Sequence, residues 1–121
     1  MFFEDVNGII TVQPQNTVVV AGTNLILNCT STNTNTGMGV IDVIWNYVAT
    51  SRKIVYNPGC TNANAAEFSN LQTYEQTNAQ TEECDVLLTA VTSSQAGVFQ
   101  CQESAYNNPS YAAEVLVLGK Y

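Results

Sequence analysis

The sequence has no histidine, few basic residues and no long hydrophobic run. Without histidine, and without a G-x-S-x-G motif or a phosphate-binding glycine loop, the usual bases and nucleophile sites of enzymes are missing. We therefore predict no enzymatic activity, no catalytic residues and no cofactor. Three basic residues against ten acidic ones give a net charge of −7, which argues against binding to nucleic acid or to anionic lipid. No stretch approaches the roughly 18 apolar residues that span a membrane, so we expect no direct membrane insertion of this segment.

Four cysteines are present, at positions 29, 60, 84 and 101. An even number of cysteines in a small domain is typical of proteins that mature in an oxidising compartment, and three pairings are possible. A four-cysteine zinc site is disfavoured because the chain has no C-x-x-C spacing and no histidine, so we expect no metal. The N-terminus lacks the basic and apolar regions of a signal peptide, and we expect an ectodomain fragment with an added start methionine.

Alternating apolar residues predict an all-β protein. Leu25, Leu27 and Cys29 form such a run, and at 121 residues the chain has the size of one domain. The expected strands cover 9–12 and 17–20, interrupted at Pro14, then 25–29, 42–48, 52–56, 84–91, 95–101 and 112–118. Residues 30–39 are rich in turn formers and are expected to form a loop, and one or two short edge strands are expected within 61–82.

The period of two also predicts which side chains point inward. The expected core consists of Val18, Val20, Leu25, Leu27, Cys29, Val43, Trp45, Tyr47, Val86, Leu88, Val91, Phe99, Cys101, Val115 and Val117.

Cys29, the single tryptophan Trp45 and Cys101 follow one another on successive predicted strands. This order resembles the V-set domains of the immunoglobulin superfamily, in which a tryptophan packs on a disulfide between two sheets. The resemblance covers nearly the whole chain. It implies an immunoglobulin-like β-sandwich of the V type over residues 1–121, with its core at roughly 9–118 and two antiparallel sheets in Greek-key topology. It also implies a Cys29–Cys101 disulfide, which leaves Cys60 and Cys84 for a second one.

The segment before Cys101 departs from the family pattern Asp-x-Gly-x-Tyr-x-Cys. The matching positions here are Gln95, Gly97, Phe99 and Cys101. Phe99 has no hydroxyl for the tyrosine-corner hydrogen bond, although its ring can fill the core. Gln95 is neutral, so the buried ion pair common in the family is absent, at little expected cost. The Asn/Thr-rich loops are similar to those of invertebrate, cnidarian-type allorecognition receptors.

The same alternation predicts a binding face on the sheet that contains Trp45. The residues expected to point outward are Ile44, Asn46, Val48, Val98, Gln100 and Gln102, framed by Tyr56, Tyr106 and Tyr111. A patch of this kind indicates a protein partner, and the alternative is an ordinary solvated surface. By resemblance, the end loops at 30–41 and 105–110, with Tyr106, Asn107 and Asn108, are a second candidate binding site.

Two further surface features are predicted. Asn28, Cys29 and Thr30 form an N-x-T sequon on the opposite sheet, so Asn28 is a candidate glycosylation site. The acidic residues Glu67, Glu75, Glu82, Glu83 and Asp85 are expected to form a solvated rim.

These features predict an extracellular recognition or adhesion module, either in the ectodomain of a membrane-anchored receptor or secreted. The preferred hypothesis is homophilic binding to the same or a similar domain on another cell, through the sheet with Trp45 and with weak self-association. The alternatives are a heterophilic immune-type receptor that binds a foreign protein or glycan through its loops, and a passive spacer.

Overall fold

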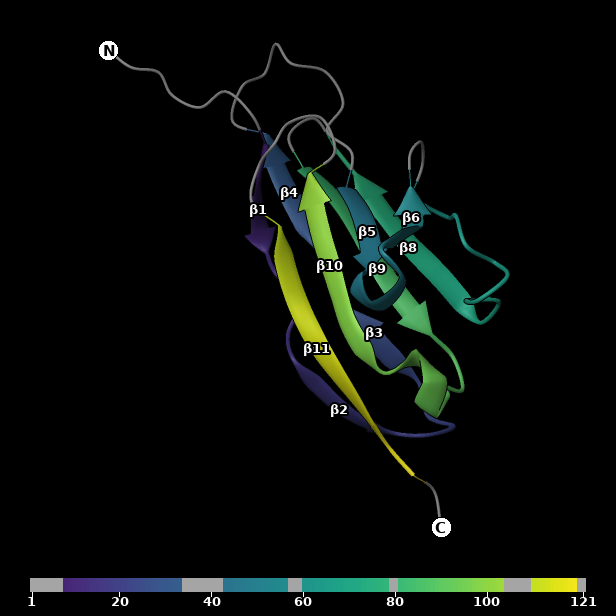
Figure 1. Ribbon diagram of the computed structural model, residues 1–121. Coiled ribbons are helices and arrows are strands. Elements are labelled where there is room, and N and C mark those ends of the chain that lie inside the picture. The colour runs from purple at the N-terminus through teal and green to yellow at the C-terminus, as the bar shows by residue number, and fades with distance from the viewer. Residues whose placement is uncertain (1–7, 34–42, 57–59, 79–80, 104–109, 120–121) are drawn as a thin grey trace.

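A computed structural model of the protein describes residues 8–33, 43–56, 60–78, 81–103 and 110–119. In these ranges the chain forms two stacked β-sheets (Figure 1). The β9 sheet contains β1 (Gly8–Val12), β4 (Thr30–Asn33), β9 (Thr81–Leu88), β3 (Leu25–Leu27) and β8 (Leu71–Thr77). The Trp45 sheet contains, in spatial order, β2 (Thr17–Val20), β11 (Tyr111–Leu118), β10 (Gly97–Glu103), β5 (Val43–Tyr47), β6 (Arg52–Tyr56) and β7 (Thr61–Asn62). Two short 3₁₀ helices, η1 (Val48–Thr50) and η2 (Ser93–Gln95), lie between strands.

The first predicted strand divides between the two sheets. β1 pairs with β4, whereas β2 pairs with β11 on the other side of the sandwich. Pro14 lies at the break, as expected for a residue that interrupts an edge strand. β2 and β11 run parallel, and the other described pairs are antiparallel. The prediction of two antiparallel sheets is therefore wrong for this one pair.

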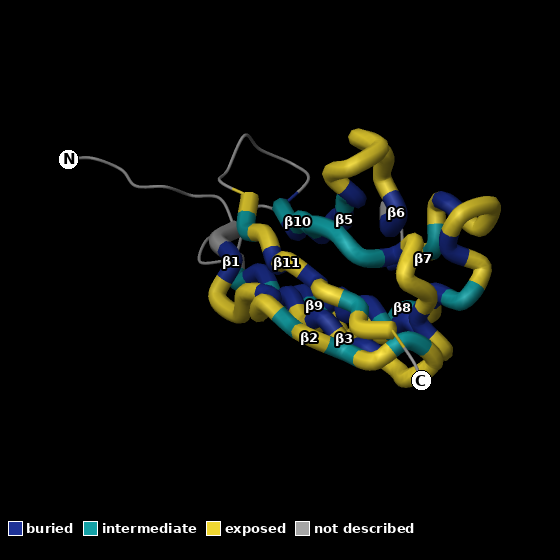
Figure 2. Tube along the Cα trace, turned by 60° about the horizontal axis from the view of Figure 1, so that its bottom comes forward, coloured by how far each residue is buried: buried dark blue, intermediate teal, exposed yellow. Residues whose placement is uncertain are grey.

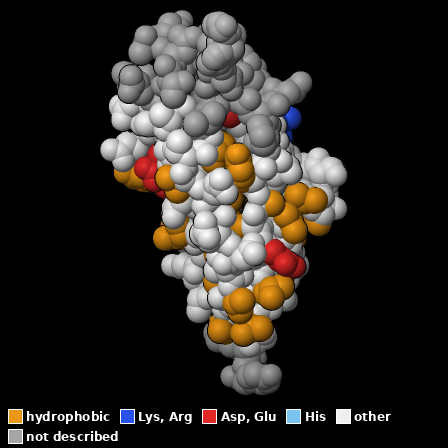
Figure 3. Space-filling view, turned by 90° about the vertical axis from the view of Figure 1, so that its left-hand side faces the viewer, with side chains coloured by type: hydrophobic (Ala, Val, Ile, Leu, Met, Phe, Trp, Pro, Cys, Tyr) orange, Lys and Arg blue, Asp and Glu red, His pale blue; other side chains and the backbone are white. Residues whose placement is uncertain are grey.

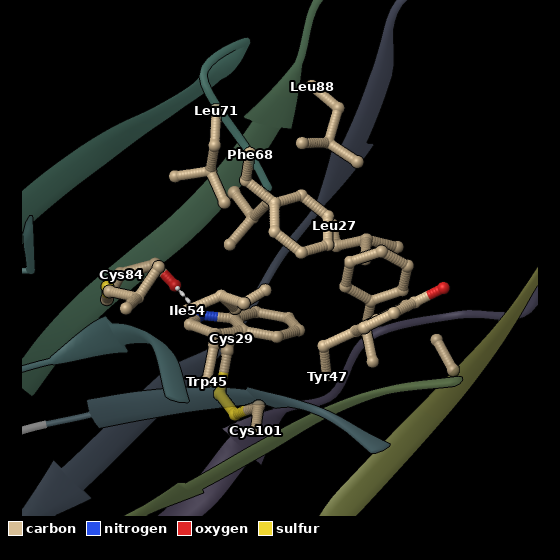
Figure 4. Close-up of a cluster of buried hydrophobic side chains, with 14 of the residues drawn as sticks. Leu27, Cys29, Trp45, Tyr47, Ile54, Phe68, Leu71, Cys84, Leu88 and Cys101 are labelled. Atoms are coloured by element: carbon tan, nitrogen blue, oxygen red, sulfur yellow. Dashed lines mark hydrogen bonds between the residues drawn. A yellow bond between two sulfur atoms is a disulfide. The ribbon is translucent and has the colours of Figure 1, made fainter. Parts of the chain in front are cut away.

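The core lies between the sheets and is centred on Trp45, which is fully buried (Figure 4). The structure contains both disulfides implied by the resemblance, Cys29–Cys101 and Cys60–Cys84. The first joins the two sheets beside the indole ring. Figure 2 shows buried positions alternating with more exposed ones along the strands, as the period of two predicts.

Two predicted core residues are wrong. Val18 and Val20 are 59% and 40% exposed, and it is Val19 that packs against the core. The physical reason is that β2 contains three consecutive valines, which carry no alternation and so do not reveal which phase points inward. Val117 is only partly buried, although it packs against the core. The remaining predicted core residues are buried.

Several strand limits also differ from the prediction. Residues 30–33 form β4 and not a loop, because Thr30 and Thr32 are β-branched and pair with β1 and β9. β9 begins at Thr81 instead of Cys84 and ends at Leu88 instead of Val91. The expected short strands within 61–82 are β7 and β8.

Candidate functional site

Three amide side chains meet on the outer face of the Trp45 sheet, and we call them the amide cluster. Asn46 of β5 lies opposite Gln100 of β10, and Gln102 follows on the same face. The Asn46 Nδ2 donates to the Oε1 of Gln102 at 3.2 Å and to the Oε1 of Gln100 at 3.5 Å. The Gln100 Nε2 in turn donates to the Ser110 Oγ at 2.9 Å. The three amide side chains are half-buried, so the centre of this face is polar, and the exposed Lys53 of β6 lies opposite Asn46.

The apolar residues predicted on this face do not form one open patch. Ile44 is only 5% exposed, although it lies outside the main core cluster, so it is covered and not available to a partner. Alternation predicts the direction of a side chain and not what covers it, which explains this error. Val98 is half-buried, and Val48 is exposed on η1 instead of on β5.

The other predicted contact residues add little to this face. Tyr111 packs partly buried against the core. Tyr106, Asn107, Asn108 and most of the 30–41 loop lie outside the described residues, as does the side chain of Tyr56.

The strands below the amide cluster are held by an unusual arrangement of hydrogen bonds around Trp45. The indole Nε1 donates to the Cys84 carbonyl at 2.8 Å (Figure 4), and the Cys84 N–H donates to the Cys29 carbonyl at 2.9 Å. The Cys29 N–H donates to the carboxylate Oδ1 of Asp85, at 3.1 Å. The Cys84 carbonyl, the cross-strand neighbour of the Cys29 N–H, accepts from the indole. The Asp85 carboxylate therefore satisfies this buried backbone donor.

Asp85 and Glu82 are both buried, so the predicted solvated acidic rim is wrong for these two residues. Glu82 points into the sandwich because it shares the phase of Cys84 and Val86, and its carboxylate accepts a hydrogen bond from Thr77. Burial is the main cause that raises the pKa of Asp85, to about 7. A hydrogen bond with Glu83 raises this pKa further, and the Cys29 N–H acts in the opposite direction.

The raised pKa of Asp85 predicts a pH dependence of stability. Between the unfolded value of about 4 and the folded value of about 7, the folded state binds more protons than the unfolded state. The contribution of Asp85 to the free energy of unfolding therefore falls as pH rises through this window and is constant above it. Asp85→Asn keeps an acceptor for the Cys29 N–H but does not titrate. We expect a weaker dependence of stability on pH in this variant, measured by urea unfolding at several pH values.

Glu75→Gln is the matched control, because it removes one exposed carboxylate from the neighbouring strand β8. An Asp85→Asn variant whose stability follows pH as steeply as that of the unmodified protein would contradict the assignment.

Two residues elsewhere in the chain, Tyr47 and Asn70, compensate for the missing hydroxyl of Phe99 and the missing charge of Gln95. The Tyr47 hydroxyl donates to the Ala96 carbonyl, so a residue on the strand next to Phe99 supplies the bond that Phe99 lacks. The rings of Tyr47 and Phe99 are 5.1 Å apart. Gln95 exchanges two hydrogen bonds with the Asn70 side chain, at 2.7 and 3.0 Å. A neutral amide pair thus links Gln95 to Asn70.

A pocket of about 240 Å³ is lined by Tyr47, Glu67, Phe68, Ser94 and Gln95. Burial, and then the charge of Glu67, raise the pKa of Tyr47. Because the Tyr47 hydroxyl and the Gln95 amide already have hydrogen-bond partners in the fold, we regard the pocket as structural. The described ranges contain no group of three or more acidic or cysteine residues placed to hold a metal ion. They also contain no helix long and apolar enough to cross a membrane.

Sequence reasoning missed a second surface, on β2 and β11. Four exposed aliphatic side chains, which we call the aliphatic strip, lie side by side there. The strip consists of Val18, Val20, Leu116 and Leu118. The sequence does indicate this surface. Residues 115–118 are all apolar, and because alternate residues of a strand point to opposite faces, two of them must point away from the core.

No protein-family model matches the sequence, and no curated protein matches it either. Solved structures do match the fold. The structure of Dpr1 IG1 bound to DIP-eta IG1 aligns with a TM-score of 0.72 and 16% identity, over 93% of this chain and 97% of that one. The Ig1 domain of mouse SynCAM 2 aligns with a TM-score of 0.67 and 17% identity, over 97% and 100% of the two chains. The ZIG-8 IG1 homodimer aligns with a TM-score of 0.61 and 17% identity, over 88% and 82%. The predicted immunoglobulin-like β-sandwich is confirmed.

Proposed function

We propose that this domain is an extracellular recognition module that binds a second copy of itself on another cell through the amide cluster. The observation that carries the proposal is the chemistry of this face. Two chains of charge −7 repel each other, but screening limits this repulsion to about 8 Å at physiological salt. The amide cluster is uncharged. Both N–H groups of Asn46 are donated within the cluster, but its Oδ1 remains an acceptor, and the two glutamine amides can still donate and accept toward an identical partner.

Three further features support the proposal. Both disulfides fit an oxidising, extracellular environment. β6 and β7 extend the Trp45 sheet beyond β5, which favours the V type. Dpr1 IG1 is bound to DIP-eta IG1 in its structure, and ZIG-8 IG1 forms a homodimer. The narrower likeness to cnidarian self-recognition receptors stays a prediction.

Asn28 is proposed as the site of an N-linked glycan. It is exposed at the junction of β3 and β4, on the β9 sheet. A glycan there would cover the outer face of the β9 sheet and leave the amide cluster accessible. Mass spectrometry of protein secreted from eukaryotic cells, before and after glycosidase treatment, tests this site.

Gln100→Glu tests the amide cluster. The substitution keeps the size of the side chain, but in a self-complementary interface it places one new negative charge on each copy against the partner's cluster. We expect beads coated with the variant to aggregate much less than beads coated with the unmodified domain. Gln72→Glu, which adds the same charge at an exposed position of β8, should leave the aggregation intact. Ile44 is unsuitable for this test because it is buried.

Unmodified domains that fail to aggregate beads would refute homophilic binding. Aggregation that survives Gln100→Glu but is lost on substitution of Tyr106 would favour the end loops instead.

A further inference from the structure

The sheet edges of the described structure are protected to different degrees. β1 has an irregular register with β4 between Ile10 and Val12, β3 is only three residues long, and β7 is only two. β8 includes a charged residue, Glu75. β2, with the sequence Thr-Val-Val-Val, has none of the devices that block edge pairing, namely charge, proline, a bulge or extreme shortness.

The backbone of Val18 faces the open edge of β2. The Ala21 N–H donates to the Leu118 carbonyl at 2.8 Å, so the odd-numbered residues of this segment point their backbone groups toward β11. Successive residues of a strand point these groups to opposite sides. The N–H and C=O of Val18 are therefore directed away from β11. The Val20 carbonyl, on the same side, is already occupied by the N–H and hydroxyl of Thr23.

The aliphatic strip borders this edge. Val18 lies opposite Leu116 and Val20 opposite Leu118 on the outer face, and the two leucines are 50% and 52% exposed. Figure 3 shows hydrophobic side chains gathered toward the lower end of this side of the molecule.

We propose that β2 is a second self-association site, where β2 of one copy pairs antiparallel with β2 of another across a two-fold axis at Val18. In this register the N–H of each Val18 donates to the C=O of Val18 in the other copy, and the two valine side chains become cross-strand neighbours. An identical strand fits because β2 carries no charge to repel its own copy. The two aliphatic strips then join on one face of a continuous sheet.

The pairing has two consequences. Because the two β2 strands are antiparallel, the β11 strands that run parallel to them end in opposite directions. The contact involves four residues per copy, well short of the roughly 1,200 Å² that specific stable interfaces bury. The association is therefore weak and becomes effective when many copies are held together. It uses an edge and not the face with the amide cluster, so it does not depend on the proposed function.

Val18→Pro and Val18→Lys test the edge. Proline removes the Val18 N–H without touching the backbone groups that face β11, and lysine introduces a charge that blocks edge pairing. Lysine also lowers the net negative charge of the chain, so a loss of association cannot come from a larger net charge on each copy. Ile26→Lys is the matched control, because Ile26 is 60% exposed on β3 of the other sheet. Circular dichroism verifies that each variant is folded, and Val18→Lys serves alone if the proline variant is not.

We expect the sedimentation of the unmodified domain, of Ile26→Lys and of Gln100→Glu to depend on protein concentration up to the millimolar range. The Val18 amide resonance should shift over the same range. Because the amide cluster remains intact in these variants, Val18→Pro and Val18→Lys should weaken the concentration dependence, and Val18→Lys combined with Gln100→Glu should abolish it. Unchanged association in the Val18→Lys variant, or an unmodified domain that is monomeric throughout, would overturn the proposal. Loss of all association in Gln100→Glu would overturn it as well, while leaving the amide cluster supported.

Discussion

Trp45→Ala is expected to lower the free energy of unfolding by about 3–5 kcal/mol, which is comparable to the total stability of many small domains. The substitution leaves a cavity beside the Cys29–Cys101 disulfide, because the indole is fully buried there. It also removes the donor that occupies the Cys84 carbonyl. Circular dichroism in urea measures the effect, since the variant loses the only tryptophan and with it the usual fluorescence signal.

Trp45→Phe separates these two contributions. It retains an aromatic ring but not the hydrogen bond, so the expected loss is smaller, about 1–3 kcal/mol. Equal losses in the two variants would mean that the packing of the indole contributes little and would contradict the central place given to it.

The Cys29→Ala/Cys101→Ala double variant should lose about 4 kcal/mol and the Cys60→Ala/Cys84→Ala variant roughly 3 kcal/mol, because the longer closed loop restricts the unfolded chain more. The sequence separations are 72 and 24 residues. The four sulfurs are buried, so the cost of lost packing is similar for both pairs. Urea unfolding of both variants gives the order, and a larger loss for the shorter loop would contradict the loop-entropy argument.

The sequence predicted the fold because its strongest signals are redundant. Leu25, Leu27 and Cys29 alternate cleanly, and Trp45 and the two distant cysteines independently indicate the same sandwich. Each of these residues is buried at the centre of the structure.

The errors arise where the local sequence does not show which side chains point inward, or where another part of the chain covers a side chain that points outward. Val18, Val19 and Val20 are chemically identical, so the inward residue is decided by pairing with β11 and not by the sequence of β2. Ile44 points outward and is nevertheless covered.

The buried acids could not be predicted for a related reason. A run of acidic residues in a sequence indicates a solvated surface. The Asp85 carboxylate accepts from the buried Cys29 N–H because the indole donates to the Cys84 carbonyl, and only the structure shows that hydrogen bond. Likewise, the amide pair of Gln95 depends on a partner 25 positions away, Asn70. The alternation around Gln95 contains no information about that partner.

The disulfide between Cys29 and Cys101 has a mechanical consequence for the domain under tension. Under tension, the segment between these cysteines cannot be pulled out, because the covalent bond carries the load across it. Only the 28 residues before Cys29 and the 20 after Cys101 can lengthen, and fully drawn out they span roughly 170 Å. A pulled molecule would thus give up β1, β2, β3 and β11, while the strands between the two cysteines stay joined by the covalent bond.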